Sequence, residues 1–180
     1  ATVYRMRRVL PEGLIGYNRP EETYVVEWTA DTWYDVSAFD DLVNRAHKQE
    51  PRRAELLEEA ISIYQGPYLS DVYSDWAAAR REQLHQAYVE GLLMLARMRI
   101  ASGDPGVGIE LYRKALAEEP YREDLHCELM KALAGAGRLA EVVQQYNALV
   151  DLLRRELHSG PTDETERLFR SIHPRPQASS

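Results

Sequence analysis

The sequence predicts a mainly α-helical protein in which antiparallel helix pairs repeat along the chain, preceded by a short helix and one β-hairpin. Three observations support this fold class. From about residue 37 onward, apolar residues recur at the spacing of amphipathic helices. Residues 14–28 contain the one clear strand signal, because they are rich in β-branched and aromatic residues. In the C-terminal half, similar residues recur with a period of 34 positions.

The N-terminal segment ATVYRMRRVL is predicted to be the end of a helix, because Val3, Met6 and Leu10 recur at helical spacing. Pro11 then ends the helical pattern. The next two segments, LIGYN and YVVEW, are predicted to form the strands of a hairpin. The polar residues RPEET between them supply its turn.

Two helices are predicted between residues 37 and 64. The first has an apolar face that consists of Phe39, Leu42, Val43 and Ala46. Ser37 is placed to cap this helix, and Pro51 suits the first turn of the second helix. Gly66 and Pro67 break the pattern and end this part of the chain.

Longer and more regular helical patterns follow. Helices are expected at about 74–101, 105–118, 122–135 and 138–157. Asp163 and Glu166 resemble the capping box of a last short helix, whose apolar face contains Phe169. Residues 173–180 are predicted to form a disordered tail.

The period of 34 residues relates several positions in this region. The equivalent pairs are Tyr112 and Tyr146, Gly103 and Gly137, Leu95 and Leu129, and Leu116 and Val150. Two helices per unit and a period of this length are typical of the tetratricopeptide repeat, which stacks into a right-handed superhelix. In that repeat, the second helix carries a small residue, an aromatic residue and another small residue, and a proline follows. These four positions are matched in order by Gly108, Tyr112, Ala115 and Pro120.

The match to that repeat is incomplete. Leu92, Ala96 and Arg99 replace the Trp, Gly and Tyr of the first helix, and Arg154 stands where the second unit should have its proline. We therefore expect the second helix of that unit to extend to about Leu157. The alternative is a set of generic helical hairpins with coincidental spacing, which four pairs on one period argue against.

A stacked array of this kind presents a concave face that is formed mainly by the first helix of each unit. Projected through the repeat, this predicted partner groove contains Glu90, Leu93, Arg97, Asp124, Cys127 and Lys131. Arg97 and Lys131 are themselves 34 positions apart. Two interpretations remain: the two cations are merely solvated, or they belong to a groove that binds a peptide or a protein.

Composition limits the classes of function. The net charge of −7 argues against a chain that binds nucleic acid over its whole surface, since phosphate contacts need clustered positive charge. Cys127 is the single cysteine, so no internal disulfide can form. No apolar run approaches the ~20 residues of a membrane helix. We therefore expect a cytoplasmic protein without a membrane partner.

Patterns typical of catalysis are missing from the sequence. The histidines are scattered, and none forms a convincing set of metal ligands with a second histidine or an acid on one face. The segment GDPGVG at 103–108 resembles a phosphate-binding loop superficially, but it follows a helix and lacks the final Lys-Ser/Thr. No serine or cysteine lies in the sequence context of an activated nucleophile. We therefore expect no enzymatic activity, no catalytic residue, no metal and no cofactor.

Several sequence marks are specific in combination. They are Gly66-Pro67, Trp76, Arg80, Leu84, Pro120, Arg122, Glu123, His126, the turn 134–138, Tyr146, and the exit Glu156-Leu157 to Gly160-Pro161 with Glu164-Thr165. Together with DVSAFDDLV at 35–43, they resemble the bacterial transcriptional activator domain, a module of regulators of the Streptomyces antibiotic regulatory protein type. The resemblance covers about residues 35–172.

The resemblance implies that a winged helix–turn–helix DNA-binding domain precedes this module. Residues 1–30 would then be its remnant, with the end of the recognition helix followed by the wing hairpin, and the rest would lie upstream of Ala1. The candidate DNA contacts are Arg5, Arg7, Arg8 and, at the wing tip, Arg19. The alternative for the first three is an ordinary amphipathic helix with a solvated basic face.

The function implied by the resemblance is that of a regulatory module in a bacterial transcriptional regulator. Its expected partners are a protein, either the transcription machinery or a second copy in a homodimer, and promoter DNA through the upstream domain. The alternative is a tetratricopeptide-like scaffold that binds a peptide or protein and has no direct role in DNA binding.

Overall fold

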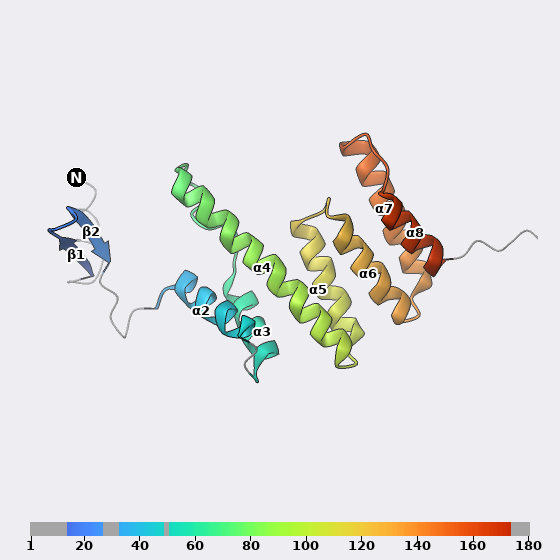
Figure 1. Cartoon of the computed structure of the whole chain (residues 1–180), viewed down its shortest axis with the longest axis horizontal. Coiled ribbons are helices and arrows are strands. Elements are labelled where there is room, and N and C mark those ends of the chain that lie inside the picture. Colours follow the sequence, from blue (N-terminus) through green and yellow to red (C-terminus); the bar gives the residue numbers. More distant parts are fainter. Residues whose placement is uncertain (1–13, 27–32, 49–50, 174–180) are drawn as a thin grey trace, which may run out of the picture. The chain divides into compact units, whose positions relative to one another are not determined.

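The computed structural model describes residues 14–26, 33–48 and 51–173 (Figure 1). The chain divides into two compact units, one that runs to Ala38 and one that begins at Phe39. A two-stranded hairpin lies in the first unit and helices dominate the second, so the predicted mainly α-helical class is confirmed. The predicted helix at 1–10 and most of the predicted tail lie outside the described residues.

The hairpin consists of β1 (Ile15–Asn18) and β2 (Thr23–Val26), which pair antiparallel as predicted. Tyr17 and Tyr24 lie directly opposite each other, and their ring centroids are 5.0 Å apart. Such cross-strand aromatic pairs stabilise a hairpin. The backbone N–H of Glu22 donates a hydrogen bond to the carbonyl oxygen of Arg19 over 3.4 Å and closes the turn.

The helical part of the described chain agrees closely with the periodicity of the sequence. Its helices are α2 (Asp35–His47), α3 (Arg53–Ile63), α4 (Asp75–Ala101), α5 (Pro105–Glu118), α6 (Glu123–Gly135), α7 (Leu139–Glu156) and α8 (Asp163–Ile172). The predicted apolar face of α2 is buried. The predicted cap is wrong, because α2 begins at Asp35 and Ser37 therefore lies inside the helix.

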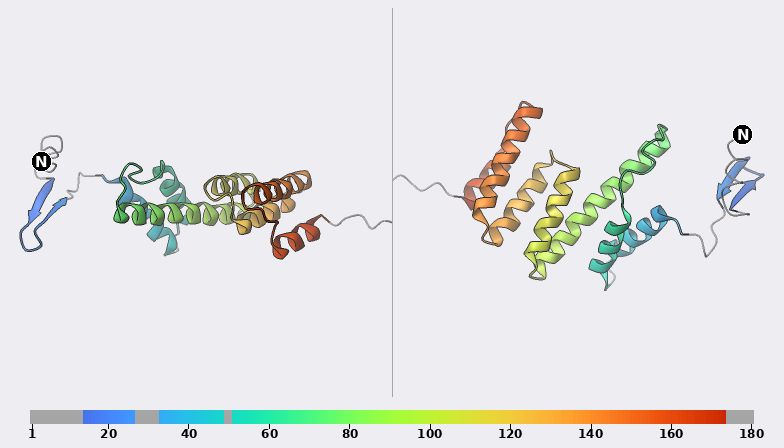
Figure 2. Two further views of the ribbon diagram at one scale, coloured as in Figure 1. Left: turned by 90° about the horizontal axis from the view of Figure 1, so that it is seen from above. Right: turned by 180° about the vertical axis from the view of Figure 1, so that it is seen from behind.

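From α3 to α7, successive helices of the second unit pack side by side. α4 is long enough to pack against both α3 and α5, and the chain then continues through α6 and α7 in antiparallel order (Figures 1 and 2). α8 packs mainly on α6. The core between these helices is apolar, and its most completely buried side chains include Leu57, Leu92, Leu93, Ile109, Tyr112, Leu125, Leu129, Met130, Leu133 and Leu149. Across the described ranges, no helix combines the length and apolar character needed to span a lipid bilayer.

The period of 34 residues is also present in the backbone. After α4, the N–H groups of residues 102, 103 and 104 donate to the carbonyl oxygens of residues 98, 100 and 99. After α6, the N–H groups of residues 136, 137 and 138 donate to the carbonyl oxygens of residues 132, 134 and 133. Gly103 and Gly137 have φ values of 88° and 74°, the left-handed conformation that a glycine adopts most easily after a helix. The two turns therefore have the same hydrogen-bonding pattern.

The small residue Gly108 allows α5 to approach α4 closely. A Cβ atom at this position would lie 2.9 Å from the carbonyl oxygen of Ala96 and 2.5 Å from Cγ1 of Ile100. Tyr112, one turn further along α5, is only 2% exposed. The sequence pattern of a small residue followed by an aromatic therefore reflects tight helix packing.

Candidate functional site

The predicted partner groove lies on neighbouring faces of α4 and α6. The period places its members in equivalent pairs, namely Glu90 with Asp124, Leu93 with Cys127, and Arg97 with Lys131. The charged members lie at the surface, whereas Leu93 and Cys127 are buried. Leu93 and Cys127 therefore lie beneath the surface of this face, and the members of the face that solvent can reach are charged side chains. We call it the α4–α6 face.

One ionic cluster on the α4–α6 face joins both predicted cations to a single carboxylate. Lys131 Nζ lies 3.0 Å from Glu128 Oε1, and Arg97 Nε lies 3.9 Å from Glu128 Oε2. The Tyr112 hydroxyl donates a hydrogen bond to Glu128 Oε2 over 3.3 Å. Glu128 was not among the predicted site residues, because the sequence does not show that it lies between the two cations.

The electrostatics of this cluster follow from Glu128. A hydrogen bond to Glu128 raises the pKa of Lys131 above its ordinary value. Burial raises the pKa of the Tyr112 hydroxyl, and the neighbouring Glu128 carboxylate raises it further. Beside the cluster lies a hollow of about 280 Å³ that is lined by Arg97, Ile100, Ala101, Tyr112, Glu128, Lys131 and Ala132. The lining of the hollow thus combines apolar and charged side chains.

A second ionic cluster lies toward the other end of the α4–α6 face. Arg122 Nη1 lies 3.6 Å from Glu90 Oε1, and its Nη2 lies 2.7 Å from Asp124 Oδ2. The hydrogen bond from Arg122 lowers the pKa of the Asp124 carboxyl group. Arg122 thus links the two predicted acids across the helices, a role that the repeat projection did not indicate.

The buried residue Cys127 leads to the contacts that hold α8. Its Sγ lies 3.4 Å from the Thr165 hydroxyl oxygen, and burial raises the pKa of the thiol. Glu123 Oε2 accepts hydrogen bonds from the Thr162 N–H, the Thr162 hydroxyl and the Thr165 hydroxyl over 2.9, 2.9 and 2.7 Å. Burial raises the pKa of Glu123, but these hydrogen bonds outweigh it and lower the pKa below its ordinary value.

These contacts correct the predicted start of α8. The N-cap is Thr162, whose hydroxyl oxygen accepts a hydrogen bond from the Thr165 N–H over 3.4 Å. The capping box predicted from Asp163 and Glu166 is therefore wrong, because Asp163 lies inside the helix and the N–H of Thr162 donates to Glu123 of α6 instead. Within residues 14–26, 33–48 and 51–173, no cluster of His, Cys, Asp and Glu could hold a metal ion.

The candidate DNA contacts belong to the first unit. Arg19 is exposed in the hairpin turn between β1 and β2. Arg5, Arg7 and Arg8 lie outside the described residues, so their assignment stays a prediction.

Comparison with known proteins supplies the family. The profile of the family described as "Bacterial transcriptional activator domain" matches residues 34–173. The regulatory protein AfsR of Streptomyces coelicolor is 27% identical over 173 residues, which cover 93% of this chain and 17% of that protein. The chain therefore spans less than a fifth of the length of this relative.

Proposed function

Because the chain belongs to the bacterial transcriptional activator domain family, we propose that its helical unit supplies a protein-binding surface that is coupled to a promoter-binding winged helix–turn–helix domain. The family is regulatory, and the similar protein AfsR is described as a regulatory protein. The protein partner belongs to the transcription machinery or is a second copy of the chain.

The observation that carries this proposal is the convergence of Arg97 and Lys131 on Glu128. The side chains of Arg97 and Lys131 are 58% and 55% exposed, so a partner can reach both. Exposed ion pairs contribute only about 0–1 kcal/mol, and a partner carboxylate can therefore replace Glu128 at little energetic cost.

The charge of the chain favours a protein partner for the helical unit. A net charge of −7 repels the phosphate backbone of DNA, so DNA contact is best assigned to separate basic residues. Arg19 at the hairpin turn, together with Arg5, Arg7 and Arg8, supplies such residues. Their contact with promoter DNA rests on the resemblance of the N-terminal segment to the end of a winged helix–turn–helix domain.

The test uses the full-length regulator with the double substitution Arg97→Glu and Lys131→Glu. Gel-shift and in vitro transcription assays on its promoter measure DNA binding and activation separately. We expect promoter binding to persist while activation falls. The matched control reverses Lys48 and Lys114, two exposed lysines outside the α4–α6 face, and should leave both assays unchanged.

Two results would contradict parts of the proposal. Unchanged activation by the Arg97→Glu, Lys131→Glu protein would show that the α4–α6 face is not the partner site. If the folded full-length regulator failed to bind its promoter at low salt, the coupling to DNA would be wrong, and the scaffold alternative would replace it.

A further inference from the structure

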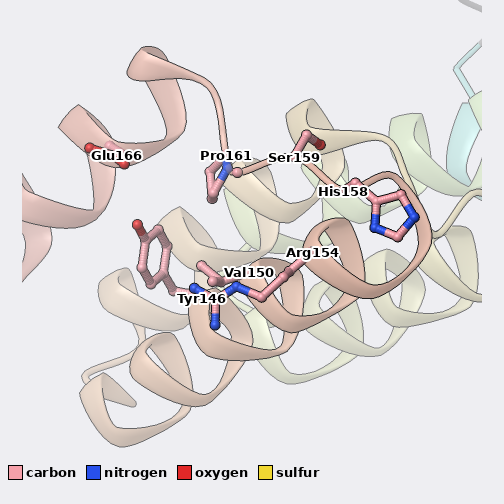
Figure 3. A pocket seen from close by; sticks show the side chains of 8 residues that line it. Tyr146, Val150, Arg154, His158, Ser159, Pro161 and Glu166 are labelled. Atoms are coloured by element: carbon pink, nitrogen blue, oxygen red, sulfur yellow. The ribbon is translucent and has the colours of Figure 1, made fainter.

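A separate cleft opens between the C-terminal half of α7 and the start of α8 (Figure 3). Its volume is about 570 Å³, within the range of small-ligand pockets. The lining residues are Tyr146, Val150 and Arg154 on α7, residues 158–161 of the connecting loop, and Glu166 on α8. We call this hollow the α7–α8 cleft, and none of these residues belongs to the α4–α6 face.

The cleft exists because the second repeat departs from the first. In the first repeat, Pro120 lies just beyond the end of α5, and α6 packs against α5. In the second, Arg154 occupies the equivalent position, α7 continues to Glu156, and α8 packs mainly on α6. One face of α7 is consequently left partly uncovered.

Burial of equivalent side chains shows the same difference. Tyr112 and Leu116 on α5 are buried, whereas their equivalents Tyr146 and Val150 on α7 are partly exposed. Phe169 of α8 stacks on the Tyr146 ring with centroids 3.9 Å apart and an interplanar angle of 4°. This contact covers one side of Tyr146 and leaves an apolar wall along the cleft.

Arg154 supplies the charge of the cleft. It is exposed and, in the part of the chain that the structure describes, forms no ion pair. Its side chain extends along α7 toward Tyr146 (Figure 3). The acid among the lining residues, Glu166, is already paired with Arg170. An unpaired guanidinium therefore faces an apolar wall formed by Tyr146 and Val150.

We propose that the α7–α8 cleft binds a short peptide segment that carries a carboxylate beside an apolar or aromatic side chain. The guanidinium of Arg154 suits a carboxylate, because its parallel N–H groups can donate two hydrogen bonds to the two oxygens. The apolar side chain of the ligand would bury surface against Val150, Pro161 and the Tyr146 ring. This site is additional to the protein-binding surface proposed above.

The test measures binding of three defined peptides to the ¹⁵N-labelled chain by NMR. The first is N-acetyl-Gly-Leu-Phe with a free C-terminal carboxylate, and the second is the same peptide with a C-terminal amide. The third, N-acetyl-Gly-Glu-Phe amide, offers the carboxylate from a side chain. We expect saturable shifts of the backbone amides of Tyr146 and Gly160 with the first peptide, the third, or both. The uncharged second peptide should bind roughly tenfold more weakly.

Arg155 provides a matched control on the same turn of α7. Its Nε donates to the carbonyl oxygen of Asp151, and it does not line the cleft. Arg154→Glu should weaken binding of the charged peptides about tenfold, whereas Arg155→Glu should change it less than about twofold. Arg154→Gln gives the same comparison if the reversal alters the NMR spectrum of the free chain.

Three outcomes would overturn the proposal. They are no saturable shift at the cleft with either charged peptide, equal affinity for the amide and the charged peptides, and equal weakening by the two charge reversals. The last result would mean that only the general charge of the region matters. Comparison of the affinities for the first and third peptides would identify whether the carboxylate comes from a chain terminus or from an acidic side chain.

Discussion

The side-chain amide nitrogen of Gln145 on α7 lies 2.6 Å from Nδ1 of His126, a buried residue of α6. On the other side of the ring, His126 Nε2 lies 3.0 Å from the carbonyl oxygen of Pro120. An amide donor at Nδ1 and a carbonyl acceptor at Nε2 suit the neutral imidazole with its proton on Nε2. Burial lowers the pKa of His126 below its ordinary value of 6.5, so protonation opposes folding.

The first prediction is a loss of stability in mild acid. Because the pKa of His126 is lower in the folded chain, the unfolded chain binds more protons as the pH falls below 6.5, and the free energy of unfolding decreases. We expect the midpoint of thermal unfolding, followed by circular dichroism, to fall between about pH 7 and about pH 5. His126→Asn should reduce this slope, and His47→Asn, at an exposed position, should not. An unchanged slope in His126→Asn would assign the effect to other groups.

The second prediction concerns the attachment of α8. Glu123→Gln removes the charge from an oxygen that accepts three hydrogen bonds from Thr162 and Thr165, and it should lower the free energy of unfolding by about 1–3 kcal/mol. Amide hydrogen exchange should become faster in α8 by a larger factor than in α4 and α5. The control Glu164→Gln alters an exposed acid in the first turn of α8 and should change stability by less than about 0.5 kcal/mol.

The pKa of Glu123 also gives a pH dependence that is distinct from that of His126. Its folded-state pKa is lowered, so its contribution to stability is present above the ordinary value of 4.5 and is lost as the pH falls through the folded value. In Glu123→Gln, this acidic part of the stability profile should become flatter. An equally steep fall would mean that the hydrogen bonds do not depend on the charge of this carboxylate.

The third prediction tests the close approach of α4 and α5. Gly108→Ala would place a Cβ atom 2.9 Å from the carbonyl oxygen of Ala96, and the helices would have to move apart. We expect the free energy of unfolding in urea to fall by about 1–3 kcal/mol. Gly135→Ala is the control, because no atom lies within 4 Å of the added Cβ and alanine favours the helix. Equal stability of the two variants would contradict tight packing at Gly108.

The fourth prediction tests the equivalence of the two helix-ending turns. Gly103→Ala and Gly137→Ala each force alanine to a positive φ, which should lower the free energy of unfolding by about 1–2 kcal/mol. No atom lies within 4 Å of the added Cβ at either site, so the loss of stability would come from the strained backbone conformation and not from steric contact. Gly160→Ala provides the comparison, because Gly160 does not have a positive φ. Clearly different losses at Gly103 and Gly137 would show that the turns are not equivalent energetically.

The helices were predictable because apolar spacing and helix-ending residues act locally. The glycines at 103 and 137 and the proline at 120 mark the ends of helices wherever the rest of the chain lies. The exact caps were less predictable: Ser37 lies inside α2, and Thr162 rather than Asp163 caps α8. A cap depends on which of several neighbouring polar residues reaches the free N–H groups, and sequence alone does not determine this.

The arrangement of the α4–α6 face was predictable only in part. The period identified which positions are equivalent, but it did not determine the rotation of each helix about its axis. Leu93 and Cys127 consequently proved to be buried, and Glu128 and Arg122 proved to bridge the predicted charges. The packing of α8 on α6 was also missed, because the contacts of Glu123 with Thr162 and Thr165 join residues about 40 positions apart.

The turns at Gly103 and Gly137, which have the same backbone hydrogen-bonding pattern, delimit a cassette of 34 residues from 103 to 136. A second copy of the cassette inserted at either glycine would connect to the flanking helices through turns of the type that the chain already contains. Stacks of this kind gain stability mainly from contacts between adjacent units. The domain could therefore be lengthened one cassette at a time, and the number of copies would then set the spacing between the two ends of the stack.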